Sequence, residues 1–137
     1  MNATPSFHVA LIVSTLLTGT SILSAPVAWG QDATAGEKLF AKCKSCHQLG
    51  ETAKNAIGPE LNGLFGRPAG SIAGFSYSPA MKAAGFTWDD ATFAAFLQDP
   101  KAKVPGTKMM AGQVKDAGQI ADLAAYLKTF GAGGKKQ

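Results

Sequence analysis

Three features are missing from this chain of 137 residues, and each absence narrows its class. No dense block of Lys and Arg with interleaved aromatic residues occurs, so the net charge of +4 does not indicate a nucleic-acid-binding protein and suits instead an acidic docking partner. No period-2 alternation of any length predicts a strand, and no internal repeat predicts a solenoid. The length fits one compact domain.

The first thirty residues contain no Lys, Arg, Asp or Glu. The apolar run from Val9 to Leu23 has the length of the hydrophobic region of a signal peptide and is short for a membrane-spanning helix. Small residues precede Gln31, so we predict cleavage before Gln31 and a mature domain over residues 31–137. Retention of the segment as a membrane anchor is the alternative, because the segment lacks the usual basic residue near its start. Cleavage and export predict a periplasmic protein.

Helical patterns cover four segments of the mature chain. Residues 34–43 predict a helix with Thr34 and Glu37 in a capping box, and residues 78–85 predict a short helix ended by Gly85. A third helix is expected between a Thr87 cap and Pro100. The last one is predicted over residues 116–131, and the final GAGGKKQ reads as a frayed tail.

Long glycine-rich stretches join these helices, with 16 glycines in the chain. The predicted fold is therefore all-α, with three to five helices in a single domain. Helices so short and loops so long do not make a self-sufficient core at this size. We expect a large apolar cofactor to fill the middle of the domain.

The stretch KCKSCHQLG at residues 42–50 spells C-x-x-C-H with Cys43, Cys46 and His47. A structural zinc site needs four ligands, and the mature chain offers only these three of the usual type. A redox dithiol normally follows a strand, whereas a capped helix precedes this motif. A structural disulfide between Cys43 and Cys46 is a further alternative. Covalent haem attachment explains all three residues at once, through two thioethers and a proximal histidine.

Counting the histidines and methionines of the mature chain limits which residue could be the second axial ligand of such a haem iron. The mature chain holds no second histidine, because His8 lies in the signal segment. Met81 lies in a predicted helix, where methionine is more often core filler. Met109 and Met110 lie in VPGTKMMAG, an irregular loop able to present a thioether to a fixed iron. A five-coordinate iron remains the alternative.

The segments CKSCH, GPELNGLFGR, GFSYS, FTW and VPGTKM resemble, in order and spacing, the class I c-type cytochromes. This is the family of the mitochondrial cytochromes c and their short soluble bacterial relatives. The resemblance covers Thr34 to Phe130. It implies a cytochrome c domain wrapped around one covalent haem c, and Met109 rather than Met110 as the second axial ligand.

Further roles follow from the resemblance position by position. Pro59 is expected to offer its carbonyl to the free ring nitrogen of His47. The resemblance also implies four residues that form hydrogen bonds to a buried haem propionate or balance its charge. These residues are Arg67, Tyr77, Trp88 and Thr107. On the first helix, Gly36 and Phe40 are expected to pack against Leu123 and Tyr126 of the last helix, with the glycine allowing a close crossing.

The chain departs from the mitochondrial pattern at three positions. Met81 stands where that pattern has Asn, Phe96 where it has Tyr, and Ala111 where it has Phe. These changes remove polar groups behind the haem and one aromatic shield beside it. A hydrogen-bonded buried water is therefore not assured by the resemblance.

The resemblance implies an electron carrier rather than an enzyme, because an iron closed by His and Met exchanges one electron and binds substrate poorly. A peroxidase or gas-binding protein is the rival, since Ala111 weakens the shield. Five lysines flank the segments expected to frame the haem edge: Lys42, Lys44, Lys101, Lys103 and Lys108. These lysines predict salt-sensitive docking to acidic redox partners. We also expect a monomer with at most peripheral membrane contact. An oxidase, a photosynthetic reaction centre, a bc-type complex and a periplasmic dehydrogenase are all open.

Overall fold

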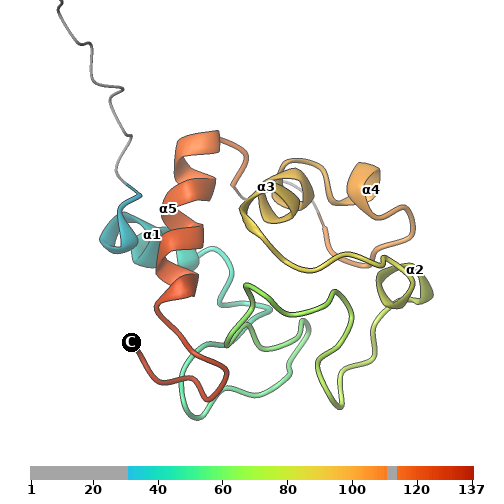
Figure 1. The fold of residues 1–137 in the computed structure, drawn as a ribbon, viewed down its shortest axis with the longest axis horizontal. Coiled ribbons are helices and arrows are strands. Elements are labelled where there is room, and N and C mark those ends of the chain that lie inside the picture. Colours follow the sequence, from blue (N-terminus) through green and yellow to red (C-terminus); the bar gives the residue numbers. More distant parts are fainter. Residues whose placement is uncertain (1–30, 111–113) are drawn as a thin grey trace, which may run out of the picture.

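The computed structural model describes residues 31–110 and 114–137. The predicted signal segment and Ala111 lie outside these described residues. Five helices appear in chain order (Figure 1). They are α1 (Ala33–Phe40), α2 (Pro79–Lys82), α3 (Asp90–Gln98), α4 (Pro100–Lys103) and α5 (Ala117–Lys128).

Strand pairing is minimal in the part of the chain that the structure describes. It consists of isolated antiparallel bridges between Pro68 and Thr87 and between Phe130 and Lys136. The prediction of an all-α domain with three to five helices is therefore confirmed. Within the same residues, the helices lack the length and apolar character needed to cross a membrane.

Helices α1 and α5 cross in close contact on one side of the molecule, and α3 packs against both α5 and α4 (Figure 1). The crossing occurs at Gly36, where a Cβ atom would lie 2.7 Å from the carbonyl carbon of Asp122 and 2.8 Å from the Cβ of Tyr126. The rings of Phe40 and Tyr126 lie beside it, with centroids 5.7 Å apart. The glycine therefore lets the two backbones meet, as the sequence indicated.

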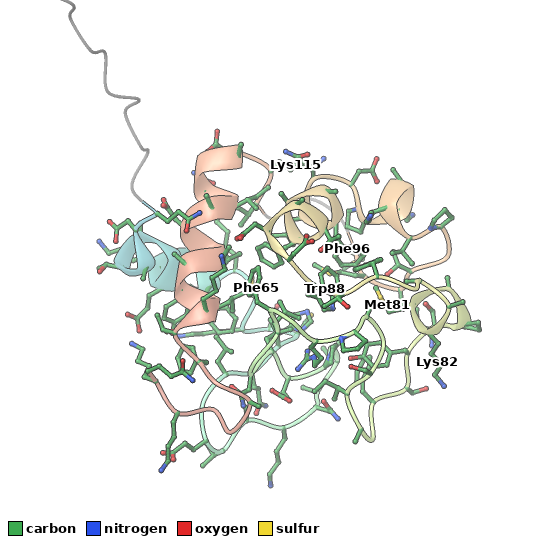
Figure 2. The ribbon with its side chains drawn as sticks, in the orientation of Figure 1. Phe65, Met81, Lys82, Trp88, Phe96 and Lys115 are labelled. Carbon is green, nitrogen blue, oxygen red and sulfur yellow. The ribbon has the colours of Figure 1, made fainter. Side chains whose placement is uncertain are left out.

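The core forms where α5 and α3 face the interior. The apolar face of α5 is buried, with Ile120, Leu123, Ala124 and Leu127 each at most 2% exposed. Around α3, the rings of Trp88 and Phe96 meet edge to face at 5.2 Å (Figure 2). The buried Met81 of α2 belongs to the same cluster, which agrees with its interpretation as core filler.

Two predicted helix caps are wrong. The cap of α1 is Asp32, whose carboxylate accepts hydrogen bonds from the amides of Thr34 and Ala35, so Thr34 lies inside the first turn. The cap of α3 is Asp89, which forms a capping box with Thr92, rather than Thr87. In both places a nearby aspartate is the cap, because its charged carboxylate satisfies the first amides and favours the positive end of the helix dipole.

Three boundaries also differ from expectation. Helix α2 ends at Lys82, before Gly85, and α4 is a separate helix that the four predicted helical segments did not include. The final residues are not frayed, because the Gln137 amide donates to the Thr129 carbonyl at 2.8 Å. Gly134 is buried against the backbone of Gly50, an approach that only a residue without a Cβ allows.

Candidate functional site

The two thiols are placed by the turns that directly follow α1. The Cys43 amide donates to the Phe40 carbonyl at 2.8 Å, and the amides of Cys46 and His47 donate to the Cys43 carbonyl at 3.0 Å and 2.9 Å. Cys43 and Cys46 thus lie one helical turn apart. Both are half-buried, and they are not joined to each other by a disulfide. Burial, and then the neighbouring Cys46, raise the pKa of the Cys43 thiol, while Lys42 opposes the shift.

The His47 imidazole is held in one orientation. Its Nδ1 lies 2.8 Å from the Pro59 carbonyl oxygen, the position that the resemblance implies. Nδ1 therefore donates a proton there, which leaves the Nε2 lone pair available to a metal. Burial lowers the pKa of His47, and the bond to Pro59 partly opposes this, so the neutral ring is favoured. Gly58 lies against the ring, where a Cβ would approach Nδ1 to 2.7 Å.

The methionine loop begins with a tight turn that its sequence explains. In Val104–Pro105–Gly106–Thr107, proline takes the second position and glycine the third, with a φ of 92° at Gly106. The Thr107 amide donates to the Val104 carbonyl at 2.9 Å and closes the turn. These are the features of a type II turn, in which the third residue needs a positive φ.

The two adjacent methionines have opposite environments. Met109 is half-buried and packs against the hydrophobic core, and its amide donates to the Thr107 hydroxyl at 3.3 Å. Met110 is 84% exposed. Of the two adjacent methionines, Met109 is therefore the one that packs against the interior.

Arg67 is the charged group of the site. Its Nη1 donates to the Asn62 carbonyl at 2.8 Å, and its Nη2 donates to the Glu60 carbonyl at 3.3 Å. Its Nε is buried without a hydrogen-bond partner, a costly arrangement for a charged donor inside a protein. Burial lowers the pKa of Arg67, and Tyr77 and Glu60 oppose this.

The other residues expected near a propionate come from different parts of the chain. Trp88 is 8% exposed and Tyr77 is half-buried, and burial is the main reason that the pKa of Tyr77 is raised. The positive charge of Arg67 opposes this rise in the pKa of Tyr77. The Thr107 hydroxyl accepts a hydrogen bond from the Met109 amide in the methionine loop.

These residues fit haem c on two independent observations. The donor set offers two free thiols one turn apart and a neutral imidazole whose Nε2 is available. The unpartnered Arg67 Nε supplies a buried donor for an anionic group such as a propionate. When bound, haem supplies a one-electron iron centre. By contrast, no three His, Cys, Asp or Glu side chains among residues 31–110 and 114–137 converge on a metal-ion position.

Comparison with known proteins agrees with this fit. The family model described as cytochrome c matches residues 33–131. This chain belongs to the cytochrome c family. A cytochrome c2 from Blastochloris viridis is 50% identical over 124 residues, covering 89% of this chain and 98% of the relative. A cytochrome c-554 from Methylosinus trichosporium is 56% identical over 106 residues, covering 77% and 80%.

Solved structures give the same result. Cytochrome cH from Methylobacterium extorquens superposes with a TM-score of 0.67 at 48% identity, covering 72% of this chain and 98% of that one. Cytochrome c2 from Rhodospirillum centenum gives a TM-score of 0.69 at 36% identity, covering 73% and 98%. The cytochrome therefore carries one covalently bound haem c, attached through Cys43 and Cys46, and functions in electron transport.

The five lysines of the predicted docking surface are all exposed: Lys42, Lys44, Lys101, Lys103 and Lys108. The Nζ of Lys103 lies over the Phe86 ring, 4.9 Å from the centroid. Its charge also helps to lower the pKa of Asp89. Part of the Lys103 side chain is therefore engaged within the molecule.

Three polar residues of the site were not predicted from the sequence: Asn55, Glu60 and Asn62. Asn62 is 7% exposed and exchanges two hydrogen bonds with the Gly50 backbone, at 2.9 Å and 3.0 Å. Asn55 and Glu60 lie in the loop that ends beside Arg67. In a sequence, a Glu or Asn in a Gly-rich loop usually indicates only a solvated surface, so no local signal identified them.

Proposed function

We propose that this cytochrome is a soluble periplasmic carrier that shuttles one electron at a time between redox complexes, with its haem iron held between His47 and Met109. The contrast between Met109 and Met110 carries the proposal. One thioether packs inward and the other is 84% exposed, so a single methionine of this loop is directed toward the interior.

Hydrogen bonds around both proposed ligands support a closed iron site. The Pro59 carbonyl fixes the imidazole and makes His47 a more basic ligand. The turn at Val104–Thr107 and the bond from the Met109 amide to Thr107 hold the methionine backbone. Two strong axial ligands held in this way leave no open iron position, which favours electron transfer over ligand or peroxide chemistry.

The partner surface is the second part of the proposal. Exposed lysines near both axial segments give an encounter surface for an acidic partner, such as a reaction centre, a bc-type complex, an oxidase or a periplasmic dehydrogenase. Association with that partner should slow as salt is raised, because screening shortens the range of the attraction. Residues 1–30 are proposed to direct export.

The ligand assignment is tested with Met109→Ala and the matched control Met110→Ala. Oxidised c-type haem with iron–sulfur ligation has a weak near-infrared charge-transfer band. Met109→Ala should abolish this band and let the reduced protein bind carbon monoxide, while Met110→Ala should keep the band. Haem content and far-ultraviolet circular dichroism confirm that both variants fold.

Two outcomes would contradict the proposal. If Met109→Ala keeps the near-infrared band, the axial ligand is another residue. If the unmodified reduced protein binds carbon monoxide readily, its sixth position is open and a gas-binding or peroxidase function is favoured.

A further inference from the structure

Glu60 is a carboxylate held in place beside Arg67. Its Oε2 accepts a hydrogen bond of 2.6 Å from the Asn62 amide, and its Oε1 lies 3.8 Å from the Arg67 Nη1. The two side chains are only 17% and 15% exposed. Because both charges are largely removed from water, this ion pair is screened less than a surface pair.

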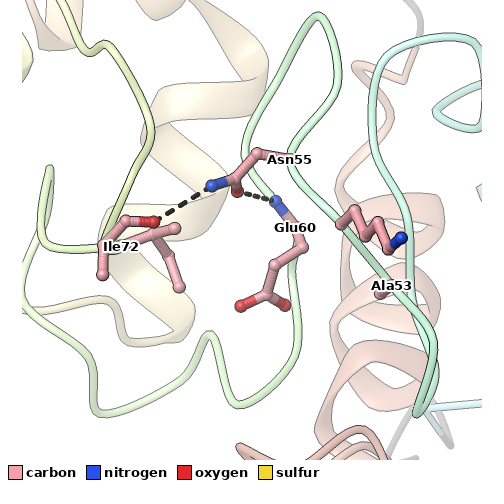
Figure 3. A pocket seen from close by; sticks show the side chains of 6 residues that line it. Ala53, Asn55, Glu60 and Ile72 are labelled. Carbon is pink, nitrogen blue, oxygen red and sulfur yellow. Dashed lines mark hydrogen bonds between the residues drawn. The ribbon is translucent and has the colours of Figure 1, made fainter.

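The backbone of Glu60 is held as firmly as its side chain. Its amide donates to the Asn55 Oδ1 at 3.1 Å, and the Asn55 Nδ2 donates to the Ala73 carbonyl at 3.0 Å (Figure 3). Asn55 thereby ties together two loops that are distant in sequence. Glu60 and Asn55 also line a surface pocket of about 370 Å³.

The electrostatic surroundings of Arg67 follow from this placement. Glu60 supplies a carboxylate near Nη1, and the buried Nε is the donor left for a haem propionate. Glu60 also contributes to the raised pKa of Tyr77, after burial, whereas Arg67 opposes it. With a haem propionate at Nε, one guanidinium would face two carboxylates, and the group of three would keep a net negative charge.

We infer that Glu60 is a positioning residue that lowers the reduction potential of the haem, by sharing the Arg67 guanidinium with a haem propionate. Oxidation adds one positive charge at the iron, and a nearby negative charge stabilises that state. Without the Glu60 charge, the guanidinium would neutralise the propionate more completely. Both effects favour the reduced haem. The inference rests on the haem-binding role of Arg67 and does not depend on which methionine binds the iron.

The test is the midpoint potential of the holoprotein, measured by spectroelectrochemical titration of Glu60→Gln. Glutamine keeps an oxygen that can accept the Asn62 amide, so the loop geometry is conserved while the charge is lost. The potential should rise, shifting the one-electron equilibrium by about threefold toward the reduced form, or about 28 mV at 59 mV per tenfold. The control Glu51→Gln removes the same charge from an exposed side chain and should shift the midpoint potential less.

Glu60→Asp keeps the charge and separates electrostatics from packing. Its potential should stay closer to that of the unmodified protein than the potential of Glu60→Gln does. The inference is overturned if Glu60→Gln shifts the potential no more than Glu51→Gln does, or if Glu60→Asp shifts it as far as Glu60→Gln. If Glu60→Gln fails to retain haem, Glu60→Ser compared with Glu51→Ser decides: a larger rise in potential for Glu60→Ser supports the inference, and an equal or smaller rise overturns it.

Discussion

Replacing Gly36 by alanine tests whether the close crossing of α1 and α5 organises the fold. The added Cβ would meet the main chain of Asp122, and it would lie 2.7 Å from its carbonyl carbon. Backbone atoms cannot rotate away as a side chain can. The helices would therefore have to separate by at least about 0.7 Å to reach an ordinary contact of 3.4 Å.

The expected cost follows from two opposing effects. Alanine gains about 1 kcal/mol over glycine in helix propensity. Forcing the helices apart costs about 3 kcal/mol, the upper part of the range for overpacked cores, because it disturbs the contact of Phe40 with Tyr126 and the buried face of α5. The net loss is about 2 kcal/mol, or a fall of about 8–16 °C in Tm for a domain of this size.

Thermal unfolding of the holoprotein, followed by circular dichroism, measures this loss. Gly118→Ala is the matched control, because Gly118 also lies in a helix and its Cβ would meet only the Asp116 side chain, at 3.2 Å. That variant should stay within about 1 kcal/mol of the unmodified protein. Equal stability of the two variants would refute the claim that the close crossing of α1 and α5 requires glycine at position 36.

Two further predictions concern the site and its scaffold. Gly58→Ala should displace the His47 ring and lower the haem content per chain, whereas Gly133→Ala, with open space around its Cβ, should not; equal haem contents would count against a role for Gly58. Hydrogen bonds from Thr92 hold the pKa of the Asp89 cap below its usual 3.8. The ionised Asp89 carboxylate therefore stabilises the folded protein above that pH, and this contribution is lost as pH falls through the lowered pKa. The excess stability over Asp89→Asn, measured by urea unfolding, should therefore shrink as pH falls below about 4, and a pH-independent difference would contradict this.

The helices show how far local patterns reach. The last helix was predicted from the sequence because its apolar residues repeat with the helical period over three turns, and burial follows that period. The caps of α1 and α3 were each misplaced by two residues. Threonine and aspartate compete for the same position in both segments, and the sequence does not determine which side chain reaches the first amides.

The chemistry of the site was largely local as well. C-x-x-C-H places two thiols and an imidazole within one turn, and VPGT closes a type II turn through its own residue types. Both depend on backbone geometry over a few residues. These short stretches, together with the scarcity of other ligands, determined haem attachment from the sequence alone.

Contacts between distant segments were decided only in the tertiary structure. The folded tail depends on Gly134 meeting Gly50, and the direction of Met109 depends on the core against which it packs. The pairing of Glu60 with Arg67 depends on a loop held by Asn55. The physical reason is the same in each case: burial and charge pairing depend on which surfaces meet in space, and residue type and sequence spacing do not specify that.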